Sequence, residues 1–319
     1  MTILNVNNLK VGFKIGEKRF SAVNNISFSV EKGETVGIVG ESGCGKTVTA
    51  LAIMRLLQEP PAYIEGGEIF FKDADILKLP ESLMQKIRGR EISMIFQEPM
   101  TSLNPVLTAG YQVAEVFMVH QNINKKEAFE KAEEMFKKVG IPNPDVRLKD
   151  YPHQLSGGLR QRVMIAIALA LNPDLLIADE PTTALDVTIQ AQILELLLKL
   201  QDEFKMSVLF ITHDLGIVSD MCKKMFVMYA GKIVEYGLAK DIFENPLHPY
   251  TEGLFHCLPK LGAKKLTPIN GIVPDLNELP KGCSFQERCP YVFNKCREID
   301  PCLISKDGKQ LVSCFKVNG

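Results

Sequence analysis

Residues 40–47 read Gly-Glu-Ser-Gly-Cys-Gly-Lys-Thr, and they follow an apolar run that ends at Val39. Apolar side chains at helical spacing begin at Thr47 and continue to Leu57, so the segment predicts a strand, a glycine-rich loop and a helix in succession. Glycines let such a loop curl until successive backbone N–H groups face one phosphate, while Lys46 adds a positive charge and the Thr47 hydroxyl can ligate Mg²⁺. The stretch therefore predicts a nucleotide-binding α/β fold, in which the Cys44 thiol is incidental.

A second anion-binding element lies at residues 155–162, which read Leu-Ser-Gly-Gly-Leu-Arg-Gln-Arg. The apolar run Val163–Leu171 follows, so Ser156, Gly157 and Gly158 stand at the N-terminus of a predicted helix. Unpaired backbone amides and the helix dipole favour negative charge there. A serine before two glycines also makes a good helix cap, and the two roles are compatible. One chain thus carries two phosphate-binding elements.

An apolar strand from Leu175 to Ala178 ends in the carboxylates Asp179 and Glu180. In isolation an acidic pair of this kind would indicate a solvated turn. Beside a phosphate loop it predicts that Asp179 holds Mg²⁺ through a water molecule, and that Glu180 orients or deprotonates the attacking water. The sequence therefore predicts nucleotide hydrolysis as well as binding.

The composition is that of an ordinary globular chain. Its 319 residues are 46% apolar and 24% charged, with a formal net charge of −1, so no basic excess points to nucleic acid. The longest wholly apolar run, Val163–Leu171, is well short of the roughly 20 residues that span a bilayer. Residues 1–5 lack the basic and then apolar layout of a signal peptide. We therefore expect a cytoplasmic chain that reaches a membrane only through partners.

Periodicity outlines the order of the elements. Residues 108–139 have a helical pattern, and the chain then alternates between helix and strand from Leu159 onward. Strands without polar alternation suit a parallel sheet covered on both faces. The predicted strands are Ala22–Val30, Thr35–Val39, Glu68–Phe71, Ile92–Phe96, Leu175–Ala178 and Ser207–Thr212, and the predicted later helices are Arg160–Leu171 and Thr188–Phe204. We expect a core at 1–245 with a helical subdomain at about 100–158, a linker at 246–280 and a tail at 281–319.

Four further matches make the chain similar to ABC ATPases. Gln97 closes a predicted strand and resembles the Q-loop glutamine, and His213 closes another and resembles the switch histidine. The segment from Ala184 to Asp186 is similar to the D-loop, and Phe13 resembles the aromatic residue that stacks on adenine, with Phe20 as its rival. The resemblance implies a P-loop NTPase with a mixed sheet, an antiparallel β subdomain and an inserted helical subdomain.

The same resemblance implies that two cassettes pair head to tail around ATP. Each signature stretch would then face the γ-phosphate that the other subunit's Lys46 holds. The residues implied to contact ATP are Phe13, Gly40, Ser42, Gly43, Cys44, Gly45, Lys46, Thr47 and Val48, with Ser156, Gly157, Gly158 and Asp186 contributed in trans. Those implied to serve Mg²⁺ are Thr47, Gln97 and Asp179, and the catalytic residues are Glu180, His213, Gln97 and Lys46.

The spacing between the phosphate loop and the signature stretch helps to choose between the functional classes of ABC proteins. About 110 residues separate Lys46 from Ser156 with no heptad run, which excludes the long coiled-coil arms of the DNA-repair and cohesion members. Translation-factor members carry two cassettes in a chain, whereas this chain has one. Transport remains the leading class, and we expect the coupling surface around Gln97–Thr108 and the helices of residues 108–139. A soluble ABC ATPase that acts on nucleic acid or ribosomes is the alternative from another class.

The C-terminal segment resembles that of the oligopeptide, dipeptide and nickel permease ATPases, with the dipeptide branch nearest. The matching residues are Asn245–Thr251, Cys283–Pro290, Cys296, Pro301, Leu303 and Cys314. The resemblance implies an ATPase that energises import of short peptides, with nickel or another small solute as the alternative. It implies a second, different ATPase subunit, two integral-membrane permease subunits and, indirectly, a secreted solute-binding protein. The chain would be peripheral on the cytoplasmic side of the membrane.

Four cysteines of this tail have a spacing that allows them to surround a metal centre. Cys283, Cys289, Cys296 and Cys314 are separated by five, six and seventeen residues. Four thiolates suit either tetrahedral Zn²⁺ or an iron–sulfur cubane, and structural zinc sites favour shorter spacings. Reduced cysteines packed as small apolar residues are a third interpretation. The family resemblance implies a 4Fe-4S cluster, with Cys302 as a free thiol beside it.

Overall fold

The computed structural model describes residues 1–183, 185–257, 268–305 and 308–318. The chain folds into two compact units. The helical unit comprises Lys78–Leu209 with Met1 and Glu31–Gly33, and the phosphate-loop unit comprises Thr2–Val30, Glu34–Leu77 and Phe210–Gly319. Strand β8 (Ser207–Thr212) passes from the first unit to the second.

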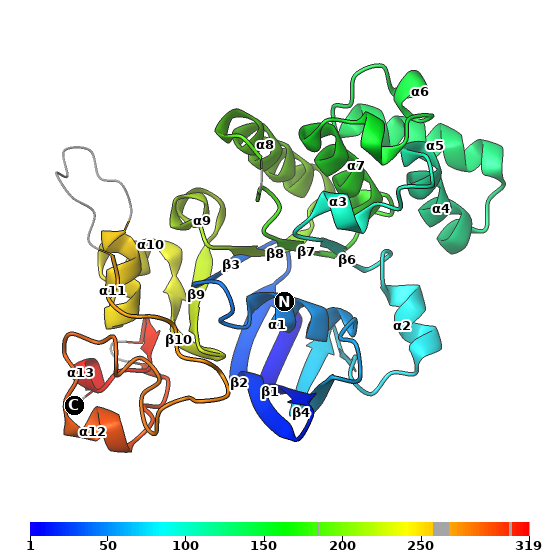
Figure 1. The fold of residues 1–319 in the computed structure, drawn as a ribbon. Helices are drawn as coiled ribbons and strands as arrows, with labels where there is room; N and C mark the ends of the chain where they lie inside the picture. The colour runs from blue at the N-terminus through cyan, green and yellow to red at the C-terminus, as the bar shows by residue number, and fades with distance from the viewer. Residues whose placement is uncertain (184, 258–267, 306–307, 319) are drawn as a thin grey trace. The chain divides into compact units, whose positions relative to one another are not determined.

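An antiparallel sheet opens the phosphate-loop unit, and Figure 1 draws its long strands in blue. Its strands, in spatial order, are β2 (Lys18–Glu31), β1 (Thr2–Ile15), β4 (Ala62–Phe71) and β5 (Ala74–Asp75). Strand β1 buries Leu4 and Val6, and then Leu9 and Val11, so the buried set changes phase between these pairs. The register with β4 shifts at the same place, where Asn8 has a φ of 49°. A bulge thus lets one long strand keep its apolar side chains in the core.

A second set of strands in this unit carries the loop predicted from residues 40–47. Strand β3 (Thr35–Val39) pairs in parallel with β9 (Lys224–Tyr229), and β9 pairs antiparallel with β10 (Lys232–Leu238). All five residues of β3 are buried, as its lack of polar alternation predicts. The end of the chain adds β12 (Leu311–Val312) to β10 and β11 (Ile304–Ser305) to β12. The tail therefore continues the sheet that holds the loop.

Short helices complete the phosphate-loop unit. Helix α1 begins at Lys46, directly after the loop, and ends at Met54 because Arg55 adopts a left-handed φ of 50° and caps it. The predicted extension to Leu57 is therefore wrong by one turn. The helices are α1 (Lys46–Met54), α9 (Leu215–Met221), α10 (Ala239–Glu244), α11 (Pro249–His256), α12 (Asn294–Glu298) and α13 (Phe315–Asn318).

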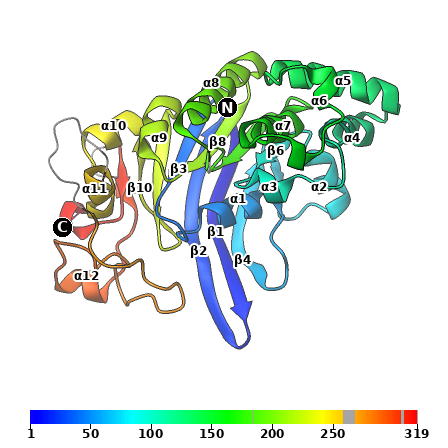
Figure 2. The same ribbon diagram turned by 45° about the horizontal axis from the view of Figure 1, so that its top comes forward.

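The helical unit contains parallel strands and most of the long helices. Strand β6 (Ile92–Ile95) pairs in parallel with β7 (Leu175–Asp179), and α4 and α5 contact each other and α7 (Figures 1 and 2). The helices are α2 (Glu81–Ile87), α3 (Pro99–Ser102), α4 (Ala109–Gln121), α5 (Lys125–Lys138), α6 (Pro144–Arg147), the 3₁₀ turn η1 (Pro152–Gln154), α7 (Gly157–Leu169) and α8 (Val187–Phe204).

These elements confirm the predicted α/β fold with an antiparallel β subdomain and a helical insertion. The main correction concerns α7, which begins at Gly157 and not at Arg160. The Ser156 hydroxyl accepts the Leu159 N–H at 3.4 Å and so starts the helix before its two glycines. Within the part of the chain that the structure describes, no helix is both long and apolar enough to span a bilayer.

Candidate nucleotide site and cysteine-rich tail

The phosphate loop has a backbone shape that two of its glycines make possible. Gly40 has a φ of 155°, and a Cβ there would lie 2.3 Å from the Met228 carbonyl oxygen of β9. Gly45 has a φ of 105°, and its Cβ would lie 2.6 Å from the Ala22 oxygen. Larger residues would push the loop away from the strands that support it, so the sequence pattern reflects a steric need at both positions.

The side chain of Lys46 bonds to the backbone of the loop that precedes it. Lys46 Nζ donates hydrogen bonds to the carbonyl oxygens of Gly40 at 2.8 Å and Glu41 at 3.0 Å. Thr47 lies half-buried in the first turn of α1, directly after the loop. Cys44 is buried, and burial raises the pKa of its thiol, so the group stays protonated and acts as a small packed side chain.

The two candidate adenine-stacking residues are neighbours. Phe13, near the end of β1, and Phe20, near the start of β2, stack with centroids 5.6 Å apart and an interplanar angle of 13°. Both rings are half-buried. His213 follows β8 directly and is exposed in the same unit. The choice between the two phenylalanines stays a prediction, as does the role of His213.

In the helical unit, the ends of β6 and β7 bring two predicted residues together. Gln97 Nε2 donates to Glu180 Oε2 at 3.0 Å, and Asp179 is buried at the end of β7. Adjacent parallel strands end at the same edge of a sheet, which explains why residues 83 positions apart meet. Glu180 has a left-handed φ of 46°, a conformation uncommon outside glycine.

Thr183 is a member of this group that the sequence interpretation missed. Its Oγ1 donates to Glu180 Oε2 at 2.9 Å, so that one carboxylate oxygen accepts two hydrogen bonds. Its position three residues after Glu180, in the turn that follows a strand, is the signal that could have identified it. These contacts hold the Glu180 side chain in one orientation.

The signature stretch and the predicted D-loop lie side by side in the helical unit. A Cβ on Gly158 would meet Ile189 at 2.9 Å, and one on Gly157 would meet Leu185 at 3.7 Å. Asp186 caps α8 by accepting the Ile189 N–H at 2.9 Å, as Ser156 caps α7. The other predicted D-loop residue, Ala184, lies outside the described residues. Two capped helix N-termini thus stand together.

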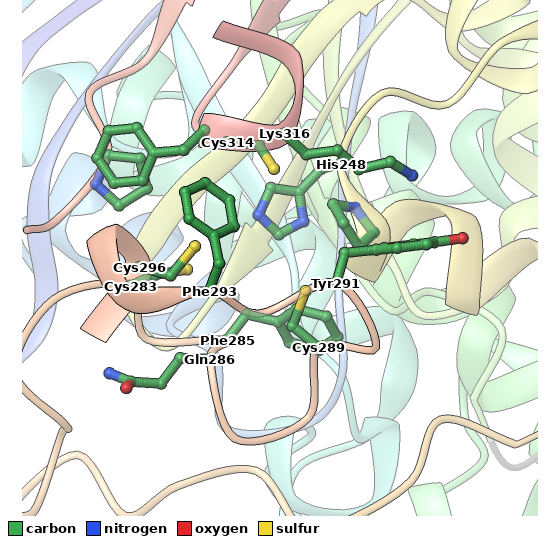
Figure 3. A pocket seen from close by; sticks show the side chains of 13 residues that line it. His248, Cys283, Phe285, Gln286, Cys289, Tyr291, Phe293, Cys296, Cys314 and Lys316 are labelled. Carbon is green, nitrogen blue, oxygen red and sulfur yellow. The ribbon is translucent and has the colours of Figure 1, made fainter. Parts of the chain in front are cut away.

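All four predicted ligand cysteines line one small cavity, with a volume of about 20 Å³ (Figure 3). Burial raises the pKa of Cys283 to about 11 and also raises those of Cys289 and Cys314, whereas Cys302 is exposed. Among the described residues, no group of three or more His, Cys, Asp or Glu is arranged to hold a metal ion. The four thiols therefore line the same cavity, but their sulfur atoms are not arranged around a common metal position.

His248 also lines this cavity, and sequence interpretation gave it no role. Its Nδ1 accepts the Tyr250 N–H at 3.0 Å. The Glu235 carboxylate accepts the N–H groups of Leu247 at 2.8 Å and His248 at 3.0 Å. The bond from Tyr250, which caps the start of helix α11, requires a neutral imidazole that accepts at Nδ1.

We expect this histidine to make the folded chain less stable in acid. Burial lowers the pKa of His248 to about 3, below the ordinary 6.5. Below pH 6.5 the unfolded chain binds a proton that the folded chain excludes, so the free energy of unfolding falls as the pH is lowered. The contribution is at most about 1.4 kcal/mol per pH unit.

Urea unfolding between pH 5 and pH 8 measures this slope. His248→Asn retains an acceptor for Tyr250 and should flatten the dependence by up to one proton, whereas the exposed His256→Asn of the same helix should not. If the free energy of unfolding depended equally on pH in the wild type and in His248→Asn, His248 would not be the cause of the acid sensitivity.

Comparisons with known proteins identify the family. A family described as ABC transporter matches residues 23–183, and one described as oligopeptide/dipeptide transporter, C-terminal region, matches residues 234–296. The oligopeptide transport ATP-binding protein AppD of Bacillus subtilis is 51% identical over 98% of this chain and 96% of its own length. OppD of Salmonella typhimurium, also an oligopeptide transport ATP-binding protein, is 50% identical over 98% and 93%.

Solved structures agree with the fold. The dimeric, post-hydrolysis ATP-binding cassette MJ0796, bound to ADP and Pi, is 29% identical with a TM-score of 0.67, covering 74% of this chain and 98% of its own. The protein cbiO1 of Clostridium perfringens, part of the ABC transporter complex cbiONQ, is 26% identical with a TM-score of 0.64 and coverages of 76% and 91%. The relatives share about half of their residues with this chain along nearly its whole length. This chain therefore belongs to the ABC transporter family, as an ATP-hydrolysing cassette that carries the C-terminal region of oligopeptide and dipeptide transporters.

Proposed function

We propose that this chain hydrolyses ATP to energise the import of short peptides. The observation that carries the proposal is the likeness of the whole chain, C-terminal region included, to proteins named for oligopeptide and dipeptide transport. These include DppD of Bacillus subtilis, a dipeptide transport ATP-binding protein that is 50% identical over 98% of this chain and 94% of its own length. Peptide selectivity would reside in the partner subunits that bind and conduct the substrate.

In this proposal the phosphate loop holds ATP, with Lys46 at the β- and γ-phosphates and Phe13 or Phe20 against adenine. Thr47, Gln97 and Asp179 offer the hydroxyl, amide and carboxylate oxygens that Mg²⁺ prefers, and the bound ion neutralises phosphate charge. Glu180 orients and deprotonates the attacking water, and the Gln97 and Thr183 hydrogen bonds keep its carboxylate in place. His213 senses the γ-phosphate.

A second cassette would complete each site. Ser156 and Gly157 are exposed at the N-terminus of α7, next to the N-terminus of α8, and both helix ends favour anions. We propose that Ser156, Gly157, Gly158 and Asp186 contact ATP held by a different ABC subunit, and a related cassette is described as dimeric. The pair would sit on two permease subunits at the cytoplasmic face of the membrane, and those permease subunits would receive peptide from a secreted binding protein.

We further propose that the tail binds a 4Fe-4S cluster, with Zn²⁺ as the alternative. The donor set supports this proposal, because four thiols from a loop, helix α12 and the residue before α13 line one cavity (Figure 3). Iron–sulfur ligation would replace their protons, since thiolates are the ligands. A bound cluster would cross-link segments that have too small a core of their own.

Metal analysis of protein purified without oxygen tests the tail. We expect about four iron and four sulfide per chain and broad absorption in the visible range. Cys283→Ser should lose both, whereas Cys302→Ser, which changes an exposed thiol outside the cavity, should keep both. One zinc per chain, with no colour, would favour the alternative and contradict the cluster.

Purification of the tagged chain from its native membranes tests the transport proposal. We expect two polytopic membrane proteins and a second ABC subunit to co-purify, and short peptides presented by the binding protein to raise ATP hydrolysis by the reconstituted complex. Stimulation of ATP hydrolysis by nickel but not by peptides would show that the transported substrate is nickel. Recovery with ribosomes or nucleic acid and no membrane protein would overturn a role in transport.

A further inference from the structure

Glu41 of the phosphate loop is held by the C-terminal segment of the same unit. Its carboxylate accepts two hydrogen bonds from the Arg288 guanidinium, Nη1 to Oε2 at 2.7 Å and Nη2 to Oε1 at 3.0 Å. Its backbone N–H donates to the Tyr250 hydroxyl at 2.8 Å, and its carbonyl oxygen accepts from Lys46. All the polar groups of this one loop residue are therefore engaged.

Arg288 is fixed as firmly as the residue it binds. Only 4% of its side chain is exposed, against 30% for Glu41. Its Nε donates to the Asn270 carbonyl oxygen at 3.1 Å, and its guanidinium carbon lies 5.8 Å from the Tyr229 ring centroid and 5.9 Å from that of Phe285. A paired, two-bond contact from a rigid arginine fixes the direction of its partner as well as its distance.

The support behind Arg288 is an aromatic cluster of Tyr229, Tyr250 and Phe285. Their ring centroids lie 4.6 to 5.5 Å apart, and Tyr250 is fully buried. Tyr229 belongs to β9 and follows Met228, whose carbonyl oxygen lies against Gly40. The cluster thus rests on the strand that also supports the phosphate loop. Phe285 and Arg288 lie in the loop between Cys283 and Cys289.

We propose that Arg288 is a positioning residue for ATP binding. By holding Glu41, it keeps the phosphate loop in the shape that receives the nucleotide, so that the loop pays little ordering entropy on binding. Arg288 and Tyr250 lie outside the phosphate-loop pattern, more than 200 residues along the chain from Glu41. The C-terminal segment thereby sets nucleotide affinity without touching the reacting atoms.

Titration with a fluorescent ATP analogue, together with steady-state hydrolysis, tests this role in the full chain. Arg288→Gln should raise the Kd and KM for ATP roughly tenfold, because it leaves the Glu41 charge unpaired and the loop loose. The value of kcat at saturating ATP should change less than about twofold, since the interaction acts on binding. Arg288→Lys, which keeps the charge but not the two-bond geometry, should fall between.

A double-mutant cycle identifies the contact itself. Glu41→Gln should weaken ATP binding as Arg288→Gln does, and the double variant should be no weaker than either single one. Arg297→Gln, which changes an exposed arginine of the same tail, should bind ATP like the wild type.

Two results would overturn the proposal. Single variants whose Tm falls while their Kd for ATP stays within twofold would make the pair a packing contact only. Strictly additive losses in the double variant would mean that the two residues act independently. If Arg288→Gln fails to fold, Glu41→Gln and Arg288→Lys still report on the same contact, so a wild-type Kd in both would refute the role.

Discussion

Glu180→Gln is expected to lower steady-state ATP hydrolysis by at least about 100-fold, the usual contribution of a positioned general base. The amide has no basic oxygen to take the proton of water, yet its carbonyl oxygen can still accept the bonds that Gln97 and Thr183 donate. Nucleotide contacts stay intact, so ATP should bind and the closed pair of cassettes should persist.

Size-exclusion chromatography with Mg-ATP measures whether the closed pair of cassettes persists in the Glu180→Gln variant. The variant should elute as a nucleotide-bound dimer that contains ATP and not ADP. Glu195→Gln, which removes an exposed carboxylate of α8 in the same unit, should hydrolyse ATP normally. Hydrolysis near the wild-type rate in Glu180→Gln would show that another group activates the water.

Ser156→Arg is expected to abolish hydrolysis while sparing ATP binding to the phosphate loop of the same chain. The bulky cation would occupy the exposed end of α7, where the γ-phosphate held by another subunit should fit. Loss of the helix cap should cost about 1 kcal/mol, which leaves the fold intact. Equilibrium binding of labelled ATP, beside a hydrolysis assay, separates these two effects.

Complementation decides whether the signature acts across subunits. Lys46→Ala should also be inactive, because it removes the phosphate-binding charge. In a pair formed by two copies of this chain, Ser156→Arg in one copy and Lys46→Ala in the other leave one site with both defects and one site with neither. Such a mixed pair should regain activity that neither variant has alone. A mixture as inactive as its components, despite proven pairing, would mean that each signature serves its own loop.

Sequence predicted the elements whose pattern is local and uninterrupted. Strands β3 and β8 have the predicted bounds because each is a short apolar run without alternation. Strand β1 was missed because the bulge at Asn8 divides its alternation into two halves of opposite phase. Helix α7 was begun too late, since two glycines argue against a helix that the Ser156 cap nevertheless starts.

In the candidate site, too, sequence predicted the features that have a local signal and missed those that only the fold brings together. Motif spacing placed Gln97 and Glu180 at strand ends, and the parallel pairing of those strands explains their contact. Nothing local marks Arg288 or Tyr250, because their partner Glu41 lies 247 and 209 residues away and only the fold joins them. The thiol spacing predicted a common cavity, but the final arrangement of four sulfurs depends on the ion that binds them.

The strand that the chain end adds to β10 limits how the cassette can be shortened. Leu311 and Val312 cover the edge of β10 at Tyr236 and Glu235, and Val312 is fully buried. Removing the last dozen residues would expose backbone donors and acceptors along that edge, which is how sheets recruit foreign strands and aggregate. The cassette core of this protein is therefore not a detachable module, and a truncated form should precipitate where the whole chain stays in solution.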